Sequence, residues 1–228
     1  MKTTSKVALV SAVALVAAAS ARAQTPYNGD LLLGFTAQSG NDFIIDIGAE
    51  SSLGTSATFN LGSQLSGFNL NTVNWGVVGD KNSAGVRTAW TTTSGSPPAA
   101  LANATAWGNL DTPTKSIYQN FTTAGAGQTL TITASDDNSW NQQMINGALT
   151  TQYHNAYQNP NLTGLGSLSL WGVVANGSAP TLLGTFALDS MGNVTFTATP
   201  VPEPSTYGVL AGLGVLAVSL RRQLRFKI

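Results

Sequence analysis

The chain has 228 residues, with ten basic and ten acidic side chains and no cysteine. Without cysteine it can form neither a disulfide nor a thiolate metal site, so its stability depends on burial and backbone pairing. Between residues 24 and 199 there are three basic and nine acidic side chains, a net charge of −6, which excludes the basic surface of a nucleic-acid-binding protein.

The first 23 residues have the pattern of a secretory signal peptide. Two lysines precede an apolar run over residues 7–19, which is too short to cross a bilayer comfortably. Ala21-Arg22-Ala23 follows, and small residues at Ala21 and Ala23 predict cleavage before Gln24. Retention of this segment as an anchor is the alternative.

Residues 24–199 predict one extracytoplasmic domain that is long enough to bury a sizeable core. Its solubility must rest on hydroxyl and amide groups, because charges are few. Short apolar runs bounded by Gly, Asn and Ser predict buried strands. We expect such strands at Asp30–Thr36, Asp42–Ile47, Ala57–Leu61 and Thr72–Val78.

The clearest hairpin lies at the end of this domain. Alternate residues are apolar or glycine over Leu182–Leu188, and Asp189–Asn193 has the composition of a turn. The next strand alternates apolar residues with Thr195, Thr197 and Thr199. One apolar and one hydroxyl-rich face predict an antiparallel sheet with one solvated side.

Two stretches depart from the strand pattern. Thr114–Thr122 and Ser139–Tyr157 have looser spacing and predict short helices, the second around Trp140–Leu149, whereas Thr91–Ala100 predicts a long loop. The predicted fold is therefore all-β: an antiparallel β-sandwich or jelly-roll-like module with one or two short helical insertions. It lies between an N-terminal signal helix and a single C-terminal transmembrane helix.

Trp-Gly-Val-Val occurs twice, beginning at Trp75 and at Trp171. The alternation places Trp75 with Val73 and Val77 on an apolar face, but places Trp171 with Ser167 and Ser169. A true duplication would place both tryptophans on the same face of their strands, so we do not predict an internal repeat.

Catalytic machinery is hard to find in this sequence. His154 is the only histidine, and no Gly-x-Ser-x-Gly motif accompanies it; we expect it to lie on a loop or on a helix surface without a catalytic role. Two pairs of carboxylates could serve a glycoside hydrolase: Asp42 with Asp46, which lie on one face of a predicted strand, or Asp136 with Asp137. We expect a protein that is not an enzyme and has no cofactor, with hydrolysis as a minor alternative.

The sequence also contains weak patterns for calcium binding and for sugar binding. Asp136, Asp137 and Asn138 form a dense oxygen cluster and are weak candidates for calcium ligands, and the segment from Asp80 to Gly85 partly matches a calcium loop. We expect solvated turns at both places and no metal site. Extracellular β modules also bind sugars on exposed aromatic rings. Trp171 is the best stacking candidate because its predicted neighbours on the strand face are polar, and a carbohydrate-binding module is therefore the main alternative function.

Residues 200–228 predict a membrane-targeting tail. Alternating prolines at 200, 202 and 204 prevent a helix and keep this strip extended. A helix over residues 205–220 would be about 24 Å long, slightly less than the hydrocarbon core. Arg221 and Arg222 begin a basic end, 221–228, that acts as a membrane stop and predicts a cytoplasmic C-terminus.

This tail resembles the PEP-CTERM sorting signal, which occurs on secreted proteins of Gram-negative bacteria that also make exopolysaccharide. The resemblance rests on the apolar run, on Arg221-Arg222 and on the motif Val201, Pro202, Glu203, Pro204, Ser205 and Thr206. It implies recognition by an exosortase-type membrane enzyme that cleaves near Pro-Glu-Pro. The implied route uses the secretion translocon and, transiently, the inner membrane, and ends at the cell surface or extracellular matrix.

The segments Gly29–Phe35, Asn41–Gly48 and Leu183–Phe196 are similar to those of a set of surface proteins that carry the same tail. This resemblance implies a secreted β module and no particular chemistry. Together, the patterns predict an exported surface or exopolysaccharide-matrix protein with polysaccharide as the expected partner.

Overall fold

The computed structural model describes residues 29–123, 125–145 and 159–200. The predicted signal peptide, His154 and the predicted transmembrane tail lie outside these residues. The elements, in chain order, are β1 (Asp30–Thr36), β2 (Asn41–Ala49), the 3₁₀ turn η1 (Glu50–Ser52), β3 (Ser56–Asn60), β4 (Asn74–Ser83), β5 (Val86–Thr93), α1 (Ala104–Tyr118), β6 (Thr129–Thr133), α2 (Trp140–Met144), β7 (Asn161–Thr163), β8 (Gly166–Val174), β9 (Thr181–Leu188) and β10 (Asn193–Ala198).

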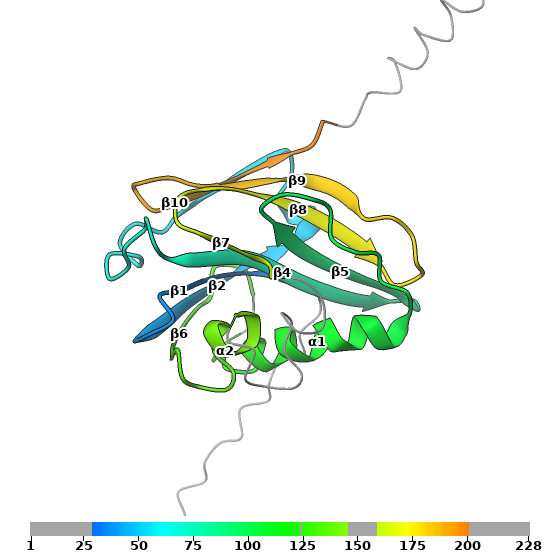
Figure 1. Ribbon diagram of the computed structural model, residues 1–228, viewed down its shortest axis with the longest axis horizontal. Helices are drawn as coiled ribbons and strands as arrows, with labels where there is room; N and C mark the ends of the chain where they lie inside the picture. Colours follow the sequence, from blue (N-terminus) through cyan, green and yellow to red (C-terminus); the bar gives the residue numbers. More distant parts are fainter. Residues whose placement is uncertain (1–28, 124, 146–158, 201–228) are drawn as a thin grey trace, which may run out of the picture.

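The ten strands form a single antiparallel sheet in the order β3-β10-β9-β8-β5-β4-β1-β2-β6, with β7 paired to β4. The sheet curls, so that β8, β9 and β10 lie above β4, β1 and β2 in Figure 1. The prediction of a mainly antiparallel β fold with short helices is confirmed. The two separate sheets of a sandwich are not present, because β5 pairs with β4 at one edge and with β8 at the other and keeps the ladder continuous.

The main core lies inside the curl. β1 contributes Leu31, Leu33 and Phe35, and β4 contributes Trp75 and Val77 from the same side of the sheet. The opposite half of the sheet contributes Leu168, Leu170, Phe186, Leu188, Val194 and Phe196. This burial of alternate residues on strands from both halves is what makes the curled sheet stable.

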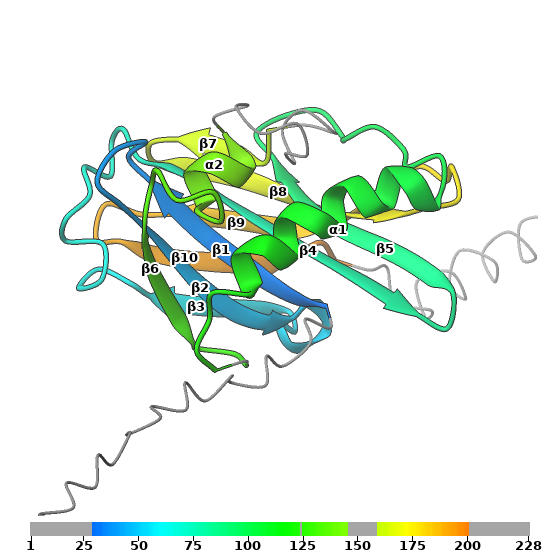
Figure 2. The ribbon, with the colours of Figure 1, turned by 90° about the horizontal axis from the view of Figure 1, so that it is seen from below.

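A second core covers the outer face of β1, β2, β4 and β5. The helix α1 runs diagonally across this face, with α2 beside it (Figure 2). Leu32, Ile44 and Val78 point outward here and pack with the helix residues Trp107, Leu110, Ile117, Trp140 and Met144. β1 is therefore buried on both faces, which explains its continuous run of apolar residues. Within the described residues, no helix has both the length and the apolar character needed to span a bilayer.

Several predicted elements are confirmed. β1 has the predicted bounds, the β9–β10 hairpin turns at Asp189–Asn193, and helices occur in both stretches where they were expected. α1 begins ten residues earlier than predicted, and β5 takes the first three residues of the predicted loop at 91–100. Trp75 lies in the inner core and Trp171 on the outer face, as predicted from the alternation of apolar and polar residues around each tryptophan.

Candidate functional site

The folded module ends where the sorting tail begins. The last ladder bonds run from the N–H of Ala198 to the carbonyl of Thr55, at 3.0 Å, and from the N–H of Thr199 to the carbonyl of Leu183, at 2.9 Å. The predicted sorting residues Val201–Thr206 and Arg221–Arg222, and the predicted cleavage residues Ala21 and Ala23, lie outside the described residues. The tail therefore follows the final strand of the sheet with no intervening element.

Trp171 is the most accessible of the five tryptophans, since the others are at most 9% exposed. It lies on β8 and is partly buried against the outer core. Its indole Nε1–H donates to the Thr93 hydroxyl at 3.0 Å. This bond fixes the ring at the border between the helix-covered half of the sheet and the uncovered half.

The proposed oxygen cluster at Asp136, Asp137 and Asn138 forms the turn between β6 and α2. Asp136 Oδ1 accepts the N–H of Asn138 at 2.9 Å, and the carbonyl of Asp137 accepts from the Gln143 amide at 2.6 Å. The first bond is that of an Asx turn that leads into the Ser139 N-cap, and the second ties this turn to α2. No group of three or more metal-ligating side chains occurs within residues 29–123, 125–145 and 159–200.

The partial calcium loop from Asp80 to Gly85 is a hairpin in the structure. Ser83 pairs with Val86 across the two-residue turn Ala84-Gly85, and both turn residues have positive φ, 51° and 83°. That geometry corresponds to a type I′ turn, which joins strands tightly. Asp80 itself lies inside β4 and is buried, whereas Asn82 lies on the exposed end of that strand.

Asp42 and Asp46 are both buried on β2, on the side that faces the helices. Asp42 Oδ2 accepts the N–H of Asn141 at 2.6 Å, and Asp46 accepts the N–H groups of Gly48 and Gly125. Burial raises the pKa of each carboxyl, and these bonds offset that effect only in part. The two residues are four positions apart on β2, a separation of about 13 Å along the strand, which exceeds the spacing of a hydrolytic pair.

The carboxyl group with the largest pKa shift is that of Asp80, which the sequence patterns placed only in the partial calcium loop. Burial, together with a hydrogen bond to Asp111 and repulsion from it, raises the pKa of Asp80 to about 9, and nearby Lys115 offsets this only partly. On α1, Lys115 Nζ lies 2.7 Å from Asp111 Oδ2. The spacing of Asp111 and Lys115 by four residues was the available signal for this pair, but their approach to Asp80 depends on the packing of α1 against β4.

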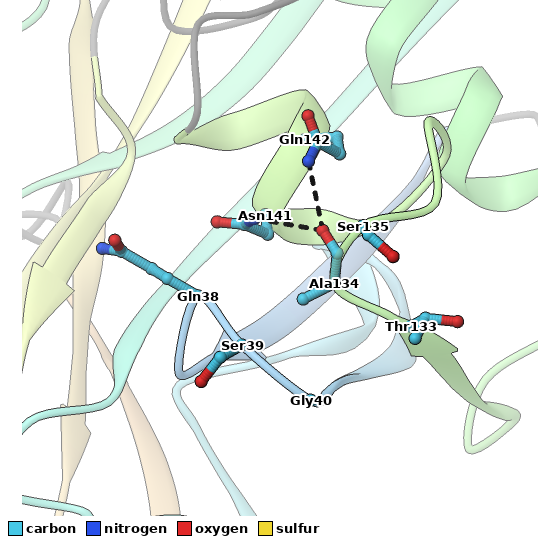
Figure 3. A pocket seen from close by; sticks show the side chains of 8 residues that line it. All are labelled: Gln38, Ser39, Gly40, Thr133, Ala134, Ser135, Asn141 and Gln142. Carbon is cyan, nitrogen blue, oxygen red and sulfur yellow. Dashed lines mark hydrogen bonds between the residues drawn. The ribbon is translucent and has the colours of Figure 1, made fainter.

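A shallow cavity of about 280 Å³ lies beside α2. It is lined by uncharged residues of the β1–β2 turn, the end of β6 and α2: Gln38, Ser39, Gly40, Thr133, Ala134, Ser135, Asn141 and Gln142. Figure 3 shows the Asn141 and Gln142 amides converging on the Ala134 carbonyl, at 3.0 and 3.3 Å. Each of these bonds uses one of the two N–H donors of an amide group.

Comparison with known families gives one finding. The family model of the PEP-CTERM protein-sorting motif matches residues 200–223. No curated protein and no solved structure matches the chain. The chain therefore carries a PEP-CTERM sorting motif directly after its β module. This motif implies C-terminal sorting by an exosortase, a membrane enzyme, and hence export through a membrane-anchored intermediate.

Proposed function

We propose that this chain is an exported, non-enzymatic protein of the cell surface or exopolysaccharide matrix, which an exosortase cleaves near Pro202-Glu203-Pro204. The sorting motif at residues 200–223 is the observation that carries this proposal. The end of the sheet supports it, because the last ladder bond, at Thr199, lies directly before the first residue of the motif.

The non-enzymatic part of the proposal is supported by the carboxyl groups. Asp42 and Asp46 bind backbone N–H groups that hold α2 and the loop before β6 in place, so both have structural roles. A hydrolase built on this pair would act on a polysaccharide and lose that activity in the Asp42→Asn variant. We expect no such activity in the wild-type chain.

Mass spectrometry of the protein recovered from the culture matrix tests the sorting step. We expect a mature N-terminus at Gln24 and a C-terminus close to Pro202-Glu203-Pro204. Mature molecules that lie outside the cell and still end at Ile228 would contradict the proposal.

Replacing Pro202, Glu203 and Pro204 with alanine tests the motif directly. We expect the triple variant to accumulate in the inner membrane, because the exosortase no longer recognises an extended strip. Pro97→Ala is the matched control, since it removes an exposed proline from a loop of the β module, and it should be processed normally.

Carbohydrate binding is a second candidate function, and the partial exposure of Trp171 favours it. Binding to a glycan array that is lost in the Trp171→Ala variant would support a stacking site. The hydrogen bond to Thr93 holds this ring in place, so loss of binding in Thr93→Val would point to the same site.

A further inference from the structure

Among the described residues, no helix covers the outer face of β3, β10, β9 and the first half of β8. The helices α1 and α2 pack on the other half of the sheet, where the core beneath them also includes Val173 near the end of β8. The uncovered strands lie at the top of Figure 1. β3, β8, β9 and β10 contain no charged residue. Soluble proteins usually carry about a quarter or more charged residues on their surface, so this uncharged sheet face is unusual.

The outward side chains of these strands form rows of hydroxyl groups. Strand register places Ser56, Thr197, Thr185 and Ser169 directly opposite one another across four neighbouring strands. A second row contains Thr58, Thr195, Ala187 and Ser167. We call the seven hydroxyl residues the hydroxyl array: Ser56, Thr58, Ser167, Ser169, Thr185, Thr195 and Thr197.

The array residues point away from the core, because their neighbours along each strand are buried or, on β3, partly buried in it. Phe186, Val194 and Phe196 alternate with them and are at most 3% exposed. Neighbouring strands are about 4.8 Å apart, and alternate residues of one strand about 6.7 Å. The array therefore presents hydroxyl groups at regular intervals in two directions over the curved outer surface.

These hydroxyl groups have hydrogen-bonding capacity that the fold does not use. In the described part of the chain, none of the seven side chains makes a hydrogen bond. Some hydroxyls elsewhere serve the fold: Thr92 bonds to Val77 and Pro160, and Thr114 bonds to Leu110. The contrast distinguishes the array from the hydroxyl residues that stabilise loops and helices.

From this arrangement we infer that the hydroxyl array is a binding face for a neutral polysaccharide, whose chain lies across the strands and exchanges hydrogen bonds with successive hydroxyl groups. Each hydroxyl both donates and accepts, as sugar hydroxyls do. An acidic polysaccharide does not fit, because the face has no cation and the module carries a net charge of −6. The inference rests on the proposed location outside the cell, where such a polymer is within reach.

Sedimentation with microcrystalline cellulose tests this inference on the purified full chain in a detergent without a sugar headgroup. We expect the wild-type chain to be retained and soluble alginate not to compete. Thr185→Val with Thr197→Val removes two hydroxyls but keeps the shape and a good strand former, and should weaken retention about tenfold, the equivalent of one or two hydrogen bonds.

Two further variants separate hydroxyl chemistry from folding. Thr185→Ser with Thr197→Ser keeps the hydroxyls and should restore retention. Thr129→Val with Thr131→Val makes the same change on β6, outside the array, and should leave retention unchanged. Absence of retention of the wild-type chain, or equal loss in the β6 control, would overturn the inference. Neither result would affect tail processing, which the mature C-terminus reports separately.

Discussion

Gly34 lies in the middle of β1, directly under the indole of Trp140. A Cβ atom at this position would overlap the Trp140 ring, and Trp140 is fully buried. We expect Gly34→Ala to lower the free energy of unfolding by about 1–3 kcal/mol, because an overpacked core must shift side chains or backbone. Urea unfolding measures this change.

Gly108→Ala is the matched control for the Gly34 variant. It introduces the same methyl group inside α1, where nothing lies within 4 Å of the new atom. Alanine favours a helix over glycine, so the control should gain about 0.5–1 kcal/mol. Equal stability of the two variants would show that the Trp140 ring does not exclude a larger side chain at position 34.

Asp80 predicts a pH dependence of stability. Its folded pKa of about 9 lies well above the unfolded value of about 4, so the folded chain holds a proton that the unfolded chain releases. The resulting stabilisation is fully present below about pH 4 and is lost as the pH rises toward 9. Burial raises the pKa values of Asp42 and Asp46 as well, so all three groups act in the same direction.

We therefore expect the melting temperature to fall as the pH is raised from mildly acidic to alkaline. Asp80→Asn should make this dependence shallower, because the amide can donate to Asp111 without titrating. Asp137→Asn removes an exposed carboxyl instead and should keep the wild-type slope. Melting curves of the three proteins across this pH range decide the question, and an unchanged slope in Asp80→Asn would refute the assignment.

At the scale of elements, α1 depends on its N-cap. Asn103 Oδ1 accepts the N–H groups of Thr105 and Ala106, both at 3.0 Å. Gly108 and Pro113 lie inside this helix and weaken it, so the cap and the packing must compensate. We expect Asn103→Ala to cost about 1 kcal/mol in urea unfolding, whereas Asn103→Asp should retain stability. An alanine variant as stable as the wild type would show that packing alone fixes the helix start.

Gly108 and Pro113 also explain why the first part of α1 was not predicted, because both residues interrupt the helical pattern. Strands with clear alternation, such as β9 and β10, followed from the sequence because side chains on one face share one environment. β6 also alternates, but its short Thr-Leu-Thr-Ile-Thr segment was not identified. The single curled sheet could not be predicted, because it depends on β5 pairing at both edges.

The candidate sites also fall into two groups: one that the local sequence predicts and others that depend on how strands and helices pack. The sorting motif is a local pattern, so the sequence predicts it without a structure, and the family model matches it. The Asp80–Asp111 contact and the hydroxyl array depend on which strands and helices become neighbours. Alternation showed that Thr195 and Thr197 share a face, but only the strand register places Thr197 beside Ser56 and Thr185.

At the scale of the whole molecule, the module and the tail should be separable. A chain that stops after Pro200 keeps the last ladder bond, at Thr199, and should unfold at the same urea concentration as the full chain. A chain that stops after Gly192 loses β10, which pairs with both β3 and β9 and buries Val194 and Phe196. Each of these side chains contributes about 1.5–3 kcal/mol, and β3 would lose its partner, so we expect the shorter chain to be degraded.

Cell fractionation of the chain that stops after Pro200 distinguishes membrane anchoring by the N-terminal segment from anchoring by the C-terminal tail. Without the tail it has no C-terminal membrane segment and no exosortase motif, so we expect it in the culture medium, with its N-terminus at Gln24. Recovery of this chain from the inner membrane would show that residues 7–19 remain as an anchor. Retention would then depend on the N-terminus, and the tail would serve only as the cleavage signal.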